Sequence, residues 1–259
     1  MFYAVTPSGE TIAHRREPGR DPVLLVHGFG SDADATWGAT GWLRALADAG
    51  RGAIVVDLRG HGASSKPHDP SAYRTSVLAA DLVAVLDAEG VGVQAAGVRG
   101  AGVGTVGVDV IGYSMGSQVA RALARDAPGR IRRLVLGGIG ENEQLRAWGV
   151  EAIEHVLIDG VDASDETATA ILRAAAERPR ADRQALAACA VGVASDELPT
   201  DPLPMPTLIV VGEADPVAAG ADALALALGA GLEVVPKRNH QTTLSSRAFK
   251  AAVLEFLAR

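Results

Sequence analysis

Val108-Asp109-Val110-Ile111-Gly112-Tyr113-Ser114-Met115-Gly116 is an apolar run that leads directly into a G-x-S-x-G turn, and a helical pattern follows from Ser117 to Ala127. In this strand–turn–helix setting the serine sits on a sharp turn with its hydroxyl exposed, and a side chain at either glycine would clash. The amide of Met115 then lies at a helix N-terminus, where it can donate to a developing oxyanion. Ser114 is therefore a candidate nucleophile, and a glycine-rich turn with a surface serine is the alternative.

A serine nucleophile needs a base and a carboxylate that orients the base, and in folds with this turn they follow in the order Ser, Asp or Glu, His. Of the six histidines, only His240 lies near the C-terminus, after a strand-like run. Upstream of it, a buried-strand pattern at 207–212 is followed at once by Glu213 and Asp215. Side chains at the ends of these two strands could both reach Ser114. The alternative for His240 is a surface loop.

A second apolar strand runs into a glycine-rich loop at Val23-Leu24-Leu25-Val26-His27-Gly28-Phe29-Gly30. The glycines allow the backbone to approach a substrate closely. We expect the amide of Phe29 to be the second oxyanion donor. His27 lies too early in the chain for the base, and we interpret it as a structural residue that holds the loop by hydrogen bonds.

Five motifs in this order resemble those of the α/β-hydrolase superfamily, in particular its serine esterases with a small cap. They are His27-Gly28-Phe29-Gly30, Asp57-Leu58-Arg59-Gly60-His61-Gly62-Ala63-Ser64, Gly112-Tyr113-Ser114-Met115-Gly116, Gly212-Glu213-Ala214-Asp215 and His240. The resemblance implies that Ser114 is the nucleophile, Asp215 the acid of the triad and His240 the base.

The same resemblance implies that the backbone amides of Phe29 and Met115 form the oxyanion hole, and that residues 57–64 form a structural turn beside the site. It implies no cofactor and no metal, because the motifs account for the histidines and the aspartate in these loops. Asn239 departs from the pattern, since relatives often carry glycine before the catalytic histidine.

Strand-like and helix-like stretches alternate along the chain after a short strand pair at 2–6 and 11–17. The other expected strands are 23–27, 53–57, 108–112, 132–138, 207–212 and 232–235, and the expected helices are 41–49, 76–89, 114–127, 220–229 and 245–258. Such alternation is typical of a mostly parallel sheet with helices on both faces. The sequence therefore predicts the α/β class, with an α/β-hydrolase fold and a helical cap insertion.

Residues 141–200 interrupt the alternation with three expected helices, near 143–158, 165–177 and 182–193. They resemble a cap that covers the pocket and excludes water, so that 1–140 and 201–259 form the hydrolase core. The alternative is that these helices simply pack on the sheet.

Residues 90–107 are rich in glycine and contain a G-x-G-x-x-G pattern, which is typical of dinucleotide sites. That pattern must follow a strand and open a helix, whereas here it precedes a strand. We therefore favour a flexible linker or an extra edge hairpin.

Composition limits the class of protein and its partners. The chain has 259 residues, 48% of them hydrophobic, with a net charge of −7. These values favour one domain with a large core, and an acidic chain is not expected to bind nucleic acid or an anionic membrane.

No run approaches the roughly 18 apolar residues of a membrane span. The start of the chain lacks a secretory pattern and Cys189 is the lone cysteine, so a cytoplasmic protein is expected. The sequence does not indicate an oligomeric state.

The predicted chemistry is acyl transfer, and hydrolysis of small carboxylic esters is the first choice. Lactone hydrolysis, carbon–carbon bond hydrolysis and cofactor-free perhydrolysis could use the same triad. A hormone-receptor-like binding protein is a different class, and the intact triad disfavours a pseudo-enzyme.

Charges at Glu151, Glu154, Arg173 and Arg180 break the apolar faces of the expected cap. They predict a compact pocket for short acyl groups of about two to six carbons.

Overall fold

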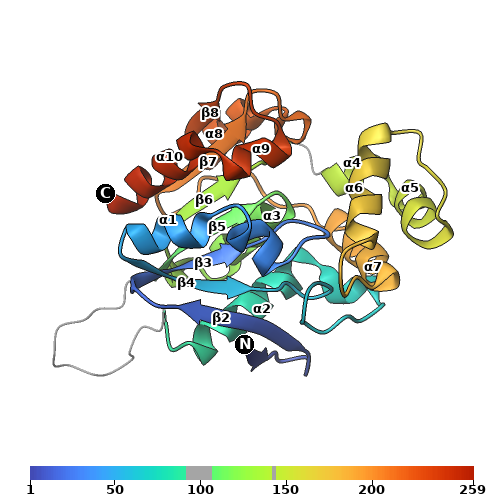
Figure 1. Ribbon diagram of the computed structural model, residues 1–259, viewed down its shortest axis with the longest axis horizontal. Coiled ribbons are helices and arrows are strands. Elements are labelled where there is room, and N and C mark those ends of the chain that lie inside the picture. The colour runs from blue at the N-terminus through green and yellow to red at the C-terminus, as the bar shows by residue number, and fades with distance from the viewer. Residues whose placement is uncertain (92–106, 142–143) are drawn as a thin grey trace.

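The computed structural model describes residues 1–91, 107–141 and 144–259. Within these residues, eight strands form one sheet in the order β1-β2-β4-β3-β5-β6-β7-β8 (Figure 1). β1 and β2 are antiparallel to their neighbours, and the strands from β3 to β8 pair in parallel. The predicted α/β class with a mostly parallel sheet is confirmed. The strands are β1 (Phe2–Val5), β2 (Thr11–Glu17), β3 (Arg20–Val26), β4 (Arg51–Val56), β5 (Val108–Tyr113), β6 (Ile131–Gly137), β7 (Thr207–Gly212) and β8 (Gly231–Val235).

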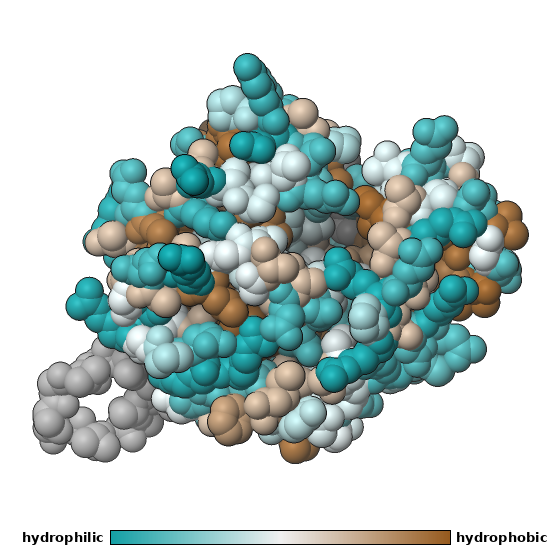
Figure 2. All heavy atoms as spheres, in the orientation of Figure 1, coloured by the Kyte–Doolittle hydropathy of each residue, from teal (hydrophilic) through white to brown (hydrophobic). Residues whose placement is uncertain are grey.

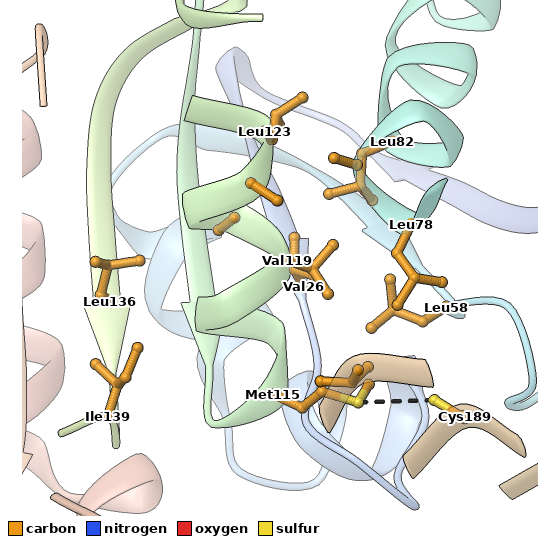
Figure 3. Close-up of a cluster of buried hydrophobic side chains, with 14 of the residues drawn as sticks. Val26, Leu58, Leu78, Leu82, Met115, Val119, Leu123, Leu136, Ile139 and Cys189 are labelled. Atoms are coloured by element: carbon orange, nitrogen blue, oxygen red, sulfur yellow. Dashed lines mark hydrogen bonds between the residues drawn. The ribbon is translucent and has the colours of Figure 1, made fainter. Parts of the chain in front are cut away.

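Helices cover both faces of the sheet, as the sequence predicts. Val23 and Leu25 of β3 share a core cluster with residues of α1 and α10, whereas Leu24 and Val26 share the opposite cluster with residues of α2, α3 and α8. Because successive side chains of a strand point to opposite faces, all four residues are buried. Figure 3 shows α2 and α3 packed together on the second face. These helices are α1 (Trp42–Asp48), α2 (Thr75–Ala88), α3 (Met115–Asp126), α8 (Ala221–Leu228) and α10 (Arg247–Ala258), and the short turns between elements are η1 (Asp34–Gly38), η3 (Pro128–Arg130) and η5 (Pro216–Ala218).

One further helix, α9 (His240–Ser245), was not predicted, and it begins at the candidate base. Asn239 caps it: the Asn239 side chain accepts a hydrogen bond from the Thr242 amide at 3.0 Å, and the Asn239 amide donates to Thr242 Oγ1 at 3.0 Å. This reciprocal pair is a capping box, and asparagine is among the preferred residues at the first position of such a box. The departure from glycine at Asn239 therefore has a local structural reason.

Between β6 and β7 the chain forms a helical insertion, which we define as residues 144–194 and which stands to one side of the sheet in Figure 1. The prediction of one helix over 143–158 is wrong, because the chain turns at Gly149, where φ is +81° and most residues would be strained. The elements of the insertion are α4 (Gln144–Trp148), α5 (Val150–Glu154), η4 (His155–Asp159), α6 (Glu166–Ala176) and α7 (Arg183–Ala194).

The insertion packs on loops at the carboxyl ends of the strands. α7 contacts η2 (Pro70–Tyr73), which lies in the loop after β4. A methyl group at Gly192 of α7 would lie only 2.3 Å from the carbonyl oxygen of Pro70. Cys189 Sγ, also on α7, lies 3.8 Å from Met115 Sδ at the start of α3 (Figure 3). The insertion thus reaches the first turn of the helix that follows Ser114.

None of the helices in the described residues is long and apolar enough to cross a membrane. Residues 92–106, where the sequence favours a linker or an edge hairpin, lie outside the described residues.

Candidate active site

Ser114 occupies the sharp turn between β5 and α3, as the sequence predicts. Its backbone has φ 55° and ψ −123°, which is strained for a residue with a side chain. A Cβ at Gly112 would lie 2.5 Å from the carbonyl oxygen of Gly116, and a Cβ at Gly116 would lie 2.2 Å from that of Val26. Both glycines are therefore required by close backbone contacts, and the turn holds the serine at the carboxyl edge of the sheet.

Asp215 and His240 come together at the ends of β7 and β8. Asp215 Oδ2 lies 2.8 Å from His240 Nδ1, and the Asp215 side chain is fully buried, whereas that of His240 is 20% exposed. Asp215 Oδ1 accepts a hydrogen bond from the Val217 amide at 3.0 Å. An ionised carboxylate only accepts hydrogen bonds, so Nδ1 is the nitrogen of His240 that donates in this pair. Glu213, the other carboxylate after β7, instead accepts from the Lys237 amide at 2.8 Å.

Tyr113, the residue before the candidate nucleophile, holds His240 in place. The Tyr113 hydroxyl donates to the carbonyl oxygen of His240, and the two rings lie 5.2 Å apart. Burial raises the pKa of Tyr113, so the hydroxyl stays protonated as a donor. From the sequence alone this residue is only a packing residue at the turn, because its partner is 127 positions away.

Ser114 and His240 line the same cavity, together with Phe29 and Met115. Ser114 Oγ makes no hydrogen bond to any residue that the structure describes, so the second link of the expected triad, between His240 and Ser114, is open in this conformation. Catalytic hydrogen bonds are often long in enzymes without substrate and tighten when substrate binds. The structure thus joins Asp215 to His240 and places Ser114 on the wall of the cavity that His240 also lines.

The glycine-rich loop after β3 lies directly against Ser114. A Cβ at Gly28 would lie 3.1 Å from Ser114 Cβ and 3.7 Å from Ser114 Oγ. The amides of Phe29 and Gly30, which follow Gly28, differ in their hydrogen bonds. The Gly30 amide donates to His61 Nε2 at 2.9 Å, whereas no described residue accepts from the Phe29 amide. The Phe29 amide therefore remains available to an oxygen atom near Ser114.

Two buried histidines support this loop from below. The Leu58 amide donates to His27 Nε2 at 2.9 Å, while His27 Nδ1 lies 2.8 Å from the Gly28 carbonyl oxygen. His61 Nδ1 lies 3.0 Å from the Arg59 carbonyl oxygen. Burial, helped by the neighbouring His27, lowers the pKa of His61 to about 3, and burial also lowers the pKa of His27. Both imidazoles are therefore neutral at pH 7, each with one donating and one accepting nitrogen.

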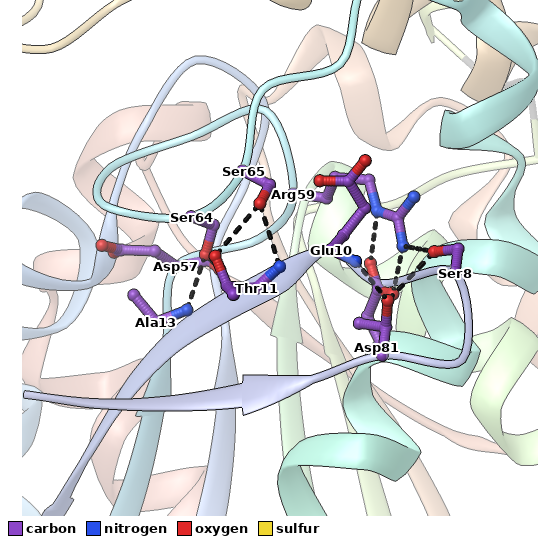
Figure 4. A network of polar contacts seen from close by, with 10 residues as sticks. Ser8, Glu10, Thr11, Ala13, Asp57, Arg59, Ser64, Ser65 and Asp81 are labelled. Carbon is purple, nitrogen blue, oxygen red and sulfur yellow. Dashed lines mark hydrogen bonds and ion pairs between the residues drawn. The ribbon is translucent and has the colours of Figure 1, made fainter.

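The turn over 57–64 is structural, as the resemblance implies. The two carboxylate oxygens of Asp57 accept from the amides of Ala33 and Ala63, each at 2.9 Å. Arg59 forms a buried pair with Asp81 of α2, with its Nη2 2.6 Å from Oδ1 (Figure 4). Through this pair and His61, the position of the glycine-rich loop after β3 depends on helix α2. No cluster of three or more His, Cys, Asp or Glu able to hold a metal occurs in the described part of the chain.

The cavity has a volume of about 860 Å³ and opens between the sheet and the insertion. Figure 2 shows this hollow on the face where the insertion stands beside the body of the molecule. α4 and α6 contribute much of its wall, and the lining residues from these helices include Leu145, Trp148, Ala170, Ile171, Ala174 and Ala175. None of the four charges that the sequence suggested would interrupt this wall, Glu151, Glu154, Arg173 and Arg180, lines the cavity.

Curated relatives match only part of the chain. An epoxide hydrolase from Caballeronia sordidicola is 40% identical over 87 residues, which cover 33% of this chain and 25% of the relative. Epoxide hydrolase A from Mycobacterium tuberculosis is 39% identical over 79 residues, which cover 30% of this chain and 24% of the relative. The chain thus spans about a quarter of the length of these relatives.

Solved structures match the fold over its whole length. A hydrolase from Pseudomonas aeruginosa PA01 has a TM-score of 0.78 at 27% identity, covering 100% of this chain and 98% of that structure. An esterase from Thermogutta terrifontis has a TM-score of 0.77 at 24% identity, covering 99% and 97%. An enol-lactonase from Burkholderia xenovorans LB400 has a TM-score of 0.74 at 21% identity, covering 100% of both chains.

A family comparison gives the same result from sequence. Residues 23–253, which hold the serine turn, the glycine-rich loop and the Asp215–His240 pair, match the alpha/beta hydrolase family, and the chain belongs to this family.

Proposed function

We propose that the protein is a serine hydrolase that cleaves small carboxylic esters through an acyl-enzyme intermediate. The observation that carries the proposal is the hydrogen bond between Asp215 and His240, because His240 lines the same cavity as a serine on a strained turn. A serine alone is a weak nucleophile, and an oriented base at the same wall is what activates it.

In the proposed cycle, His240 Nε2 removes the proton of Ser114 as Oγ attacks the ester carbonyl. The oxyanion of the tetrahedral intermediate accepts hydrogen bonds from the amides of Phe29 and Met115, and removal of one such donor typically costs roughly 3–4 kcal/mol. His240 then gives its proton to the leaving alcohol, and water, activated by the same imidazole, hydrolyses the acyl-enzyme. Asp215 stabilises the imidazolium that forms in both halves of the cycle.

The partial matches to epoxide hydrolases raise a second reaction, which the serine disfavours. Attack of a serine hydroxyl on an epoxide carbon would form an ether, which water does not cleave at neutral pH. A carboxylate nucleophile would instead form an ester, which water can cleave. Because Ser114 occupies the turn, an acyl-enzyme can be hydrolysed and the enzyme regenerated. An ether formed from an epoxide would stay on the serine and stop the cycle.

The insertion would act as a cap over this cavity and would limit the access of water to the reacting groups. The side chains of α4 and α6 that line the cavity support this role as a cap. Residues 141–200 would then form the cap, and 1–140 with 201–259 the hydrolase core.

A substrate panel tests the proposal. Purified protein is assayed against matched esters, lactones, β-diketones and epoxides, and for peracid formation, with Ser114→Ala as the control. We expect ester hydrolysis that the substitution abolishes. Equal activity in the Ser114→Ala protein, or turnover of epoxides alone, would reject the proposal. A clear excess of lactone, diketone or peracid turnover would keep the nucleophile and change the substrate.

A further inference from the structure

The C-terminal end of α6 is seated on the glycine-rich loop that carries the Phe29 amide. A Cβ at Gly30 would lie 2.2 Å from Ala175 Cβ, so the two backbones are in close contact. Arg178 follows within one turn, with its amide 3.3 Å from the Ala175 carbonyl oxygen, and it lines the cavity. Arg178 therefore lines the cavity just beyond the helix end that contacts the loop of Phe29.

The charge of Arg178 reaches the groups beneath this loop. Burial is the main cause that lowers the pKa of His27, and the positive charge of Arg178 adds to the shift. His27 bonds to the Gly28 carbonyl oxygen, and Gly28 lies against Ser114. Arg178 is thus close enough to His27 for its charge to contribute to that shift.

Arg178 has no counter-charge of its own. Its side chain makes no hydrogen bond or ion pair with any residue that the structure describes. Arg173 on the same helix, by contrast, pairs with Asp162 at 2.6 Å. Among the described residues, the acidic one that lines the cavity is Glu166, at the other end of α6. With a rise of about 1.5 Å per residue, the two ends of α6 lie roughly 15 Å apart. Glu166 is therefore too far away to neutralise Arg178.

We propose that Arg178 binds a carboxylate of the substrate, so that the preferred substrates are esters that carry an anionic group beside the scissile bond. This inference rests on the proposed ester hydrolysis at Ser114. A guanidinium presents a planar fork of donors that matches a carboxylate, and such charge-assisted pairs are stronger than neutral hydrogen bonds. The proposal makes Arg178 a specificity-determining residue, while the bond that breaks is the ester bond attacked by Ser114.

The test compares monomethyl succinate, glutarate and adipate with their neutral amides, methyl succinamate, glutaramate and adipamate. The two members of each pair have nearly the same shape and differ in charge. We expect wild type to prefer the anionic ester by about tenfold in kcat/KM, mainly through KM. The preference should be seen for the ester whose carbon chain spans the distance between Ser114 and Arg178. The preference should fall as sodium chloride is added, because salt screens the attraction.

Two variants separate the roles of neighbouring arginines. Arg178→Gln should bring the ratio of anionic to neutral kcat/KM to about one. Arg180→Gln is the matched control, since Arg180 is also exposed and without an ion pair in the described residues but does not line the cavity. It should keep the wild-type ratio.

Binding to Ser114→Ala protein, measured by calorimetry with the three monomethyl esters, makes the test independent of turnover. Adding Arg178→Gln should weaken that binding about tenfold. If no ester is hydrolysed but binding depends on Arg178, the proposed function fails and the carboxylate site stands. If esters are hydrolysed but the ratio is one in wild type, or unchanged in Arg178→Gln, the carboxylate site fails and the proposed function stands. Absence of any binding to the Ser114→Ala protein also overturns it.

Discussion

At the scale of single residues, Ser114 and His240 belong to elements that are far apart in sequence and meet at one cavity. If they act as one unit, Ser114→Ala and His240→Ala should each lower kcat by roughly 10⁴- to 10⁶-fold, and the double variant should be little worse than either. Steady-state kinetics on the best ester of the panel gives all three values. Losses that multiply in the double variant would mean that the two side chains act independently.

The carboxylate can be identified at the same scale. Asp215 contacts His240 and is buried, whereas Glu213 accepts a hydrogen bond from the Lys237 amide. Asp215→Asn should lower kcat by about 10⁴, because the amide favours the wrong tautomer of the imidazole. Glu213→Gln is the matched control, since glutamine keeps the acceptor for Lys237 and should leave kcat little changed. The opposite ranking would assign the acid to Glu213.

The positions of these residues could be predicted because each lies beside a strand end that is readable from its apolar run. The order of the strand ends in the chain then favoured His240 and left Glu213 and Asp215 as the two candidate acids, between which the family resemblance favoured Asp215. Tyr113 could not be predicted as a partner of His240, because the contact depends on how β8 and α9 fold back over the turn. The role of Asn239 was likewise hidden, since its capping pair needs a helix that was not predicted.

At the scale of an element, the glycine-rich loop after β3 is fixed by neutral imidazoles, and this makes stability depend on pH. The pKa of His61 falls from an ordinary 6.5 to about 3 in the folded protein. The unfolded chain therefore binds a proton below pH 6.5 that the folded chain does not, and the contribution is lost as the pH falls from 6.5 toward 3. From this residue alone, stability should drop by about 2 kcal/mol between pH 7 and pH 5.

Urea unfolding at a series of pH values checks this dependence. His61→Gln should flatten the slope of the unfolding free energy against pH, whatever its effect on stability at pH 7. His155→Gln, which removes an exposed imidazole, serves as the control and should keep the wild-type slope. A His61→Gln slope equal to that of wild type would show that this imidazole is not held neutral.

The boundaries of the core elements could be predicted to within a few residues, because fully buried strands are continuous apolar runs and the helices between them are amphipathic or apolar. The insertion was less readable. Gly149 is the only local signal that separates α4 from α5, and glycine within a helical pattern is often tolerated. α9 is six residues long, too short for a periodic signal.

At the scale of the whole molecule, the insertion forms part of the cavity wall, and we expect it to limit the size of the substrate. Ala174 of α6 lines the cavity, and Glu177 beyond the same helix is exposed and does not. Ala174→Trp should fill space on the substrate side and lower kcat/KM for p-nitrophenyl hexanoate roughly tenfold more than for the acetate. Glu177→Trp is the control for an added indole. Equal effects of the two variants on both esters would argue against a cap.

The expectation of short acyl groups stays a prediction, but the charges that suggested it do not line the cavity. From sequence, the face that α6 presents to the cavity could not be known, since it depends on the contact between Ala175 and Gly30. The fold and the strand ends that carry the candidate site residues follow from local patterns, whereas the shape of the pocket follows from packing between the insertion and the core.

Covalent labelling tests the central claim, the nucleophilic role of Ser114, most directly. The protein is treated with a fluorophosphonate probe, its intact mass is measured, and the labelled peptide is sequenced by tandem mass spectrometry. We expect one adduct per chain, on Ser114, that is absent in Ser114→Ala and forms far more slowly in His240→Ala. No adduct on the folded wild type, or an adduct of the same yield in Ser114→Ala, would contradict the claim.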